Sequence, residues 1–200
     1  MSSVVISGDT SGAITVAAPA VAGTNTITLP AVTGTAVVAG QNSAITAATA
    51  QTASGSSVDF TGIPSWVKRI TVTLDGISFA AAGVARIRLG TSSGLETTGY
   101  TGVVFNYTTT PTISTSALSS SPEGMFAVAG SAAATTVSGV ITIVNSEGNK
   151  WISTGQVNRV GDSTQAIGNG AITLPSTLDR LSLVATTSTF DAGTINILYE

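Results

Sequence analysis

The sequence predicts an all-β protein, and three observations lead to this prediction. Only 8% of the 200 residues are charged, whereas about 25% is usual for globular chains. The polar surface must therefore come mainly from Ser, Thr, Asn and Gln, which suit strands and turns better than helix surfaces. Short apolar segments alternate with polar residues, and no segment sustains a helical period. We expect a jelly-roll-like antiparallel β-sandwich, preceded by an N-terminal extended segment of short strands.

Residues 1–56 form the predicted N-terminal segment. Every aromatic residue lies at or beyond Phe60, and Asp9 is the only charged residue among the first 58. Small side chains gain little by burial, at about 25 cal/mol per Å², against roughly 1–2 kcal/mol per residue for ordering the backbone. This segment is therefore either flexible or ordered by neighbouring chains, and its short strand candidates favour association. Its expected strands are Val4–Ile6, Ile14–Val16, Thr26–Leu29 and Ala36–Val38.

Turn residues in this segment are regularly spaced. Gly12, Gly23 and Gly34 recur every eleven residues, and Pro19 and Pro30 follow the same spacing. Two interpretations stay open: a repeated unit of strand and turn, or a meander of short hairpins. The following residues 39–57 have the composition of a linker, with a short helix over Ala44–Ala53 as the alternative.

Residues 57–200 form the predicted sandwich domain. Ile70–Leu74 alternates strictly between apolar and polar residues, which is typical of a half-buried strand. Val140–Val144 and Lys150–Val157, joined across Glu147-Gly148-Asn149, give the clearest hairpin. The first strand of this hairpin is expected to begin at Val137, and the other expected strands are Val84–Leu89, Gly102–Tyr107, Met125–Ala129, Ala171–Leu174, Leu181–Ala185 and Thr194–Tyr199.

The composition argues against catalysis, cofactors and nucleic acid. Cysteine and histidine are both absent, which removes the usual nucleophile–base pairs and the commonest metal ligands. A net charge of −3 with seven scattered cations offers no basic patch for phosphates. Two carboxylates as in glycosidases are the remaining catalytic option, but several acids here lie in turn sequences where they bond local backbone. We expect no enzyme activity, no cofactor and no bound metal.

No membrane or export signal is expected either. The chain contains no uninterrupted apolar stretch of about 18 residues, as a transmembrane helix requires. Its first residues lack the basic region and apolar core of a secretory signal. We expect the protein to be made and assembled in the cytoplasm.

Four residues are candidates for contacting a ligand. Arg86 and Arg88 alternate with apolar residues and share one strand face, where they would clamp a carboxylate or sulfate of an anionic glycan. The alternative for both is an exposed face paired with acids of a neighbouring strand or chain. Tyr100 and Trp151 carry rings that could stack on a sugar, and the alternative for both is a place in the core or in a subunit interface.

Four passages resemble proteins of one family. Ala13–Ala31 is similar to the leader of many phage tail-fibre and related virion proteins, and Val58–Val72 resembles the opening of a β-sandwich domain common at the ends of phage fibres. Gly90–Tyr100 and Phe190–Glu200 resemble later parts of that domain. The resemblance implies a virion protein, a homotrimer, attachment to other virion proteins through the N-terminal part, and a carboxy-terminal part pointing outward.

Three functions follow as hypotheses. The first is a short phage fibre or appendage subunit whose sandwich binds a host-surface glycan or protein. The second is a capsid decoration or head-fibre protein, favoured by the short chain of 200 residues, which leaves no room for a long shaft. The third is a glycan depolymerase that uses two acids, disfavoured by the absence of histidine.

Overall fold

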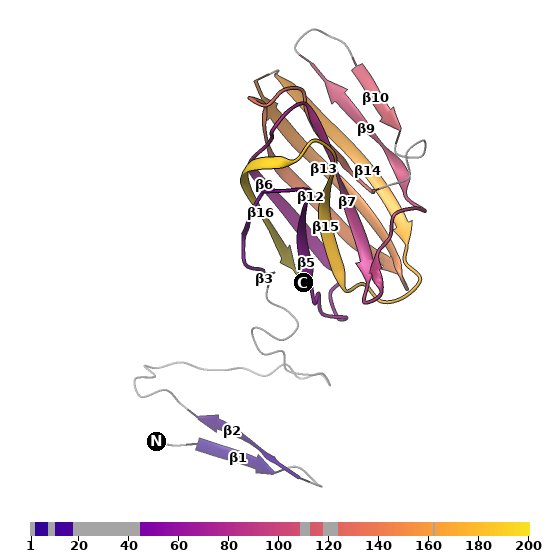
Figure 1. Ribbon diagram of the computed structural model, residues 1–200. Coiled ribbons are helices and arrows are strands. Elements are labelled where there is room, and N and C mark those ends of the chain that lie inside the picture. Colours follow the sequence, from indigo (N-terminus) through magenta and orange to yellow (C-terminus); the bar gives the residue numbers. More distant parts are fainter. Residues whose placement is uncertain (1–2, 8–10, 18–44, 109–112, 118–123, 162) are drawn as a thin grey trace. The chain divides into compact units, whose positions relative to one another are not determined.

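The computed structural model describes residues 3–7, 11–17, 45–108, 113–117, 124–161 and 163–200 (Figure 1). Within these ranges all regular elements are strands, and every strand pair is antiparallel. The chain divides into two compact units, residues 1–36 and 37–200. The all-β prediction is therefore confirmed.

The described part of the first unit is a single hairpin. Strands β1 (Ser3–Ser7) and β2 (Ala13–Ala17) pair in register from Ser3 opposite Ala17 to Ser7 opposite Ala13. The strands predicted at Val4–Ile6 and Ile14–Val16 are thus confirmed. The predicted strands Thr26–Leu29 and Ala36–Val38, and most of the eleven-residue spacing, lie outside the described residues.

The second unit is a β-sandwich whose larger sheet has nine strands. Their order across the sheet is β10 (Ile113–Ala117), β9 (Thr101–Tyr107), β14 (Thr164–Thr173), β13 (Lys150–Val160), β12 (Thr136–Glu147), β6 (Arg69–Phe79), β16 (Phe190–Tyr199) and β3 (Thr46–Ala47), while β4 (Gln51–Thr52) also pairs with β16. The smaller sheet has the order β11 (Ala127–Gly130), β7 (Gly83–Thr91), β15 (Arg180–Thr187) and β5 (Ser57–Thr61), and β8 (Gly94–Leu95) pairs with β7.

The core fills the space between the two sheets. Alternation along β6 and β12 directs Ile70 and Ile141 inward from the larger sheet, and alternation along β7 and β15 directs Ile87 and Leu183 inward from the smaller one. Each of these four side chains is fully buried. Such a core, shared by both sheets, holds strands together that lie far apart in the sequence.

The inner face also contains glycines where backbones approach closely. A Cβ atom added to Gly170 on β14 would lie 2.0 Å from the carbonyl oxygen of Met125. The hydroxyl of Ser153 on the neighbouring strand β13 donates to that same oxygen at 3.0 Å. The segment before β11 can therefore lie directly against the larger sheet because Gly170 has no side chain.

Most predicted strands are confirmed, including the hairpin of β12 and β13. Its turn places Glu147 opposite Lys150, with Gly148 at φ +50°. β14 begins at Thr164, seven residues before the predicted start at Ala171. The short strand β5 was not among the predicted strands, nor was β10. The jelly-roll topology stays a prediction, because the sheet order establishes a sandwich and no more.

The sandwich begins earlier in the chain than residue 57. Tyr199 pairs with Thr46 of β3, and Thr194 pairs with Thr52 of β4, while Ala53 is fully buried. The interpretation of residues 39–57 as a linker is therefore wrong for 46–53, as is the alternative of a helix over Ala44–Ala53. The composition could not show this, because the free edge of β16 supplies the hydrogen-bond partners.

Candidate functional site

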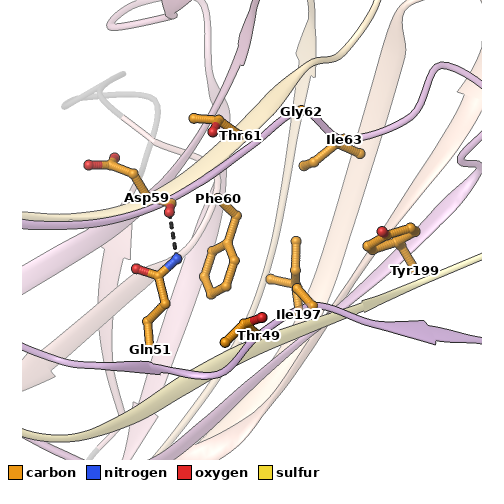
Figure 2. Close-up of a pocket in the computed structure, with 10 residues that line it drawn as sticks. Thr49, Gln51, Asp59, Phe60, Thr61, Gly62, Ile63, Ile197 and Tyr199 are labelled. Carbon is orange, nitrogen blue, oxygen red and sulfur yellow. Dashed lines mark hydrogen bonds between the residues drawn. The ribbon is translucent and has the colours of Figure 1, made fainter.

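A hollow lies at the edge of the sandwich where the two sheets approach each other (Figure 2). It has a volume of about 240 Å³ and is lined by residues of the β3–β4 segment, of β5 with the turn after it, and of β16. Its lining residues are Ala48, Thr49, Gln51, Asp59, Phe60, Thr61, Gly62, Ile63, Ile197 and Tyr199.

Alternation along β5 gives the hollow an apolar floor and a polar mouth. Phe60 is buried and lies close to Ile197 in Figure 2, whereas the carboxylate of Asp59 points to the opposite side of the strand. The Oγ of Ser57 donates to Asp59 Oδ2 at 2.9 Å, and both residues are on the outer face of the smaller sheet. Gly62 ends the strand with φ +71°, a conformation that other residues rarely adopt.

One hydrogen bond joins the two sheets across the hollow. Gln51 Nε2 donates to the main-chain carbonyl oxygen of Asp59 at 2.7 Å, drawn as a dashed line in Figure 2. Because β15 is the only strand that pairs with β5 in the described part of the chain, this carbonyl belongs to a free sheet edge. The Gln51 amide replaces a strand partner there, and an edge blocked in this way is less open to pairing with other strands.

An aromatic pair borders the hollow. The rings of Trp66 and Tyr199 have their centroids 5.9 Å apart at an interplanar angle of 51°, and Tyr199 is one of the lining residues. Amphipathic rings beside amide and hydroxyl groups are the combination that polar ligands such as sugars require. The hollow is smaller than the roughly 300–1,000 Å³ usual for ligand pockets, so it fits one sugar ring or one side chain.

The predicted arginines lie on the outer face of the smaller sheet. Arg86 and Arg88 are both half-buried residues of β7. Arg88 stands in register with Ser182 of β15, which in turn is opposite Asp59 of β5. The structure therefore brings a cation and the Asp59 carboxylate onto one face. The proposed clamp for an anionic group stays a prediction.

Two nitrogen atoms of the Arg86 guanidinium lack hydrogen-bond partners. Its Nε and Nη1 atoms are buried and have no hydrogen-bond partner among the described residues. Donors of a charged group that are removed from water without a partner are costly. Because both atoms lie out of contact with solvent, they are not open to an anion at this face.

Tyr100 is not available to a ligand. Its side chain is 1% exposed, and its hydroxyl accepts from the Leu89 N–H at 2.9 Å and lies 3.1 Å from the carbonyl oxygens of Leu89 and Glu96. Burial raises the pKa of Tyr100 well above its usual range, so the phenol stays neutral. We correct the ligand-contact prediction: Tyr100 anchors the β7–β9 connection to β7.

Trp151 is likewise a core residue. It is 3% exposed at the start of β13 and belongs to the buried cluster between the sheets. Its position opposite Ile172 of β14 and its inward direction follow from the alternation of β13. The alternative interpretation given for Tyr100 and Trp151, a place in the core, is the one that describes their surroundings.

Several carboxylates have structural partners. Asp179 forms an ion pair with Arg180 at 3.0 Å, Glu200 forms one with Arg69, and Ser78 donates to Asp191. Among the described residues no group of three or more acids could hold a metal ion. The absence of cofactor, metal and catalysis remains an expectation from the sequence.

Gln51 and Tyr199 were not found by sequence reasoning. Tyr199 lies in the Thr194–Tyr199 strand prediction, but only the pairing of β16 with β3 and β4 places it at a sheet edge. Gln51 lay in the supposed linker. A glutamine among Ala and Thr carries no local signal for an edge cap, so this part of the site required tertiary structure.

Comparison of the chain with protein-family models, with curated proteins and with solved structures gave no match. In the part of the chain that the structure describes, no helix has the length and apolar character needed to cross a membrane.

Proposed function

We propose that this chain is a subunit of a bacteriophage appendage, such as a short fibre. In this proposal the N-terminal unit attaches to other virion proteins, copies associate as a homotrimer, and the sandwich presents a surface to a glycan or protein of the host. The virion is the place of action, with assembly in the host cytoplasm. The resemblance of Ala13–Ala31 and Val58–Val72 to phage fibre proteins motivates the proposal.

The observation that carries the proposal is the hairpin of the first unit. Val5, Ile6 and Val16 are exposed by 57%, 58% and 56%, and β1 and β2 pair only with each other among the described strands. Isolated two-stranded hairpins are marginal in water, and burying one Val or Ile side chain contributes about 1.5–3 kcal/mol. Association with further chains would supply that burial, as attachment to a particle requires.

The surface for the host is the second element of the proposal. The hollow beside Tyr199 and the outer face with Arg86, Arg88 and Asp59 lie on or beside the smaller sheet. They combine aromatic, amide and charged groups, which suits recognition of a polar glycan or of a protein loop.

Immunogold electron microscopy of purified particles tests the proposed function. Antibodies raised against residues 45–200 should label a discrete appendage at the tail or baseplate. Label spread evenly over the capsid would instead support the alternative of a decoration or head-fibre protein. Label on host membranes with none on particles would refute both.

A further inference from the structure

Sixteen outward-facing residues of four neighbouring strands form what we call the uncharged face. The strands are β9, β14, β13 and β12 of the larger sheet, and their registers place the residues in four rows. The rows are Thr101, Ala171, Ile152, Val144; Val103, Asn169, Thr154, Thr142; Phe105, Ile167, Gln156, Val140; and Tyr107, Gln165, Asn158, Ser138. None of the sixteen is Asp, Glu, Lys or Arg.

Half of these residues are apolar, and several are large and open to solvent. Five of them are between 38% and 48% exposed, namely Tyr107, Val140, Val144, Ile152 and Ile167. The other half of the face consists of Thr, Ser, Asn and Gln. Val144 lies beside Ile152, and Ile167 lies beside Phe105, and large apolar side chains that are grouped on one exposed sheet face mark a candidate interaction site.

The opposite outer face of the sandwich is different in charge. The smaller sheet carries Arg86, Arg88 and Asp59 in its outward positions, on neighbouring or next-neighbouring strands. Charged residues are depleted from the centre of protein interfaces relative to the rest of the surface. The distribution of charge therefore favours the larger sheet over the smaller one as the side that a partner covers.

We propose that the uncharged face is the surface through which the sandwiches of neighbouring copies pack against one another. The inference rests on the proposed function only in requiring that the chain associates with itself. It adds which surface makes the contact, namely the larger sheet of the sandwich, in addition to any association through the hairpin of the first unit. The smaller sheet, with its arginines and the adjoining hollow, then remains free for the host.

The size of the face suits this partner. Four strands about 4.8 Å apart, each contributing about seven residues at 3.4 Å, span roughly 450 Å². Including the adjoining outer positions of β6 and β16, where Thr71, Thr73, Asn196 and Leu198 lie in register, raises this to roughly 550 Å². Two such faces would together bury roughly 1,100 Å², which is above the roughly 1,000 Å² that a specific interface needs.

The chemistry of the face favours another copy over a glycan or a charged protein. Its centre contains aliphatic and small polar side chains, whereas stacking on sugars needs aromatic rings, and both aromatic residues of the face, Phe105 and Tyr107, lie on its outermost strand β9. A charged partner would lose hydration without gaining an opposite charge. A second uncharged face loses no charge hydration, and the Thr, Asn and Gln side chains can exchange hydrogen bonds across the contact.

Sedimentation equilibrium of the full chain with one substitution inside and one outside the face tests the inference. Thr154→Lys places a charge at the centre, where Thr154 lies between Thr142 and Asn169. Thr189→Lys makes the same change at an exposed position between β15 and β16. The wild-type chain should be oligomeric. Thr154→Lys should raise the dissociation constant about a hundredfold or more, because each added charge is buried unpaired, and Thr189→Lys should change it less than threefold.

Urea unfolding of each variant shows whether it is folded. If Thr154→Lys is not folded, Gln156→Lys takes its place, because Gln156 is also exposed on the face. An oligomer that Thr154→Lys and Gln156→Lys leave intact would overturn the inference, yet particle labelling could still support the proposed function. A monomeric wild-type chain would overturn it too. If that monomer bound host cells and Thr154→Lys abolished the binding, the face would be a host-contact surface instead.

Discussion

Replacing Tyr100 by Phe removes one hydroxyl from the centre of a buried hydrogen-bond arrangement. In the native structure this hydroxyl accepts from the Leu89 N–H at 2.9 Å and reaches the carbonyl oxygens of Leu89 and Glu96 at 3.1 Å. The Leu89 carbonyl also accepts from the Glu96 N–H at 2.9 Å. After the substitution the Leu89 N–H and the Glu96 carbonyl lose this partner, while the Leu89 carbonyl keeps its other donor.

The expected cost follows from the groups left unpaired. A buried donor or acceptor without a partner costs about 1–3 kcal/mol, and the ring itself keeps its packing because only the oxygen is removed. We expect Tyr100→Phe to lower the free energy of unfolding by about 2–3 kcal/mol. This is a large share of the roughly 5–15 kcal/mol that holds a typical domain folded.

Urea unfolding followed by tryptophan fluorescence measures this cost at one fixed protein concentration, since self-association also contributes to stability. Tyr107→Phe is the matched control, because Tyr107 is 40% exposed and should change the free energy of unfolding by no more than about 0.5 kcal/mol. If Tyr100→Phe costs no more than Tyr107→Phe, the hydroxyl does not hold the β7–β9 connection and the reasoning is refuted.

Three further predictions concern pH, close packing and the sheet edge. Burial raises the pKa of Tyr100 above its ordinary value of 10.0, so the unfolded chain releases this proton at a lower pH than the folded chain does. The contribution of Tyr100 to stability is therefore complete below about pH 10 and falls as the pH rises further. When the urea midpoint is measured against pH, the wild-type chain should show this fall and Tyr100→Phe should lack it. Gly170→Ala should destabilise by about 3 kcal/mol in the same assay, because its Cβ would lie 2.0 Å from the Met125 oxygen; a loss below about 0.5 kcal/mol would show that the segment before β11 does not lie there. Gln51→Ala should cost about 0.5–1.5 kcal/mol by freeing the Asp59 carbonyl, and a loss near 3 kcal/mol would mean that Gln51 does more than cap this edge.

Sequence reasoning found the strands whose side chains alternate clearly. β6 carries Ile70, Val72 and Leu74 at alternate positions, and β12 carries Ile141 and Ile143 in the same way. This pattern is independent of what packs against it. β14 was placed too late because Gly168 and Gly170 precede the predicted start at Ala171. These glycines weaken a strand signal, but the structure uses them where Val104 and Met125 approach the backbone closely.

The candidate site depended more heavily on tertiary structure. Arg86 and Arg88 could be assigned to one strand face from alternation alone, and β7 has this arrangement. Tyr100 and Trp151 could not be separated from surface aromatics, since only the packing of the two sheets shows that both are buried. The role of Gln51 depends on two other strands. Pairing with Ile195 of the distant strand β16 holds Gln51 in place, and its side chain caps the free edge of β5 at Asp59.

The native mass in solution tests the central claim most directly, that copies of this chain assemble through surfaces left open in the single chain. Light scattering on a size-exclusion column should be applied to residues 1–200 and to a shortened chain that begins at Ile45 and keeps the whole described sandwich. We expect a trimer for the full chain and a weaker, concentration-dependent assembly for the shortened one, because the uncharged face remains while the hairpin is lost. A monodisperse monomer in both cases would contradict the account.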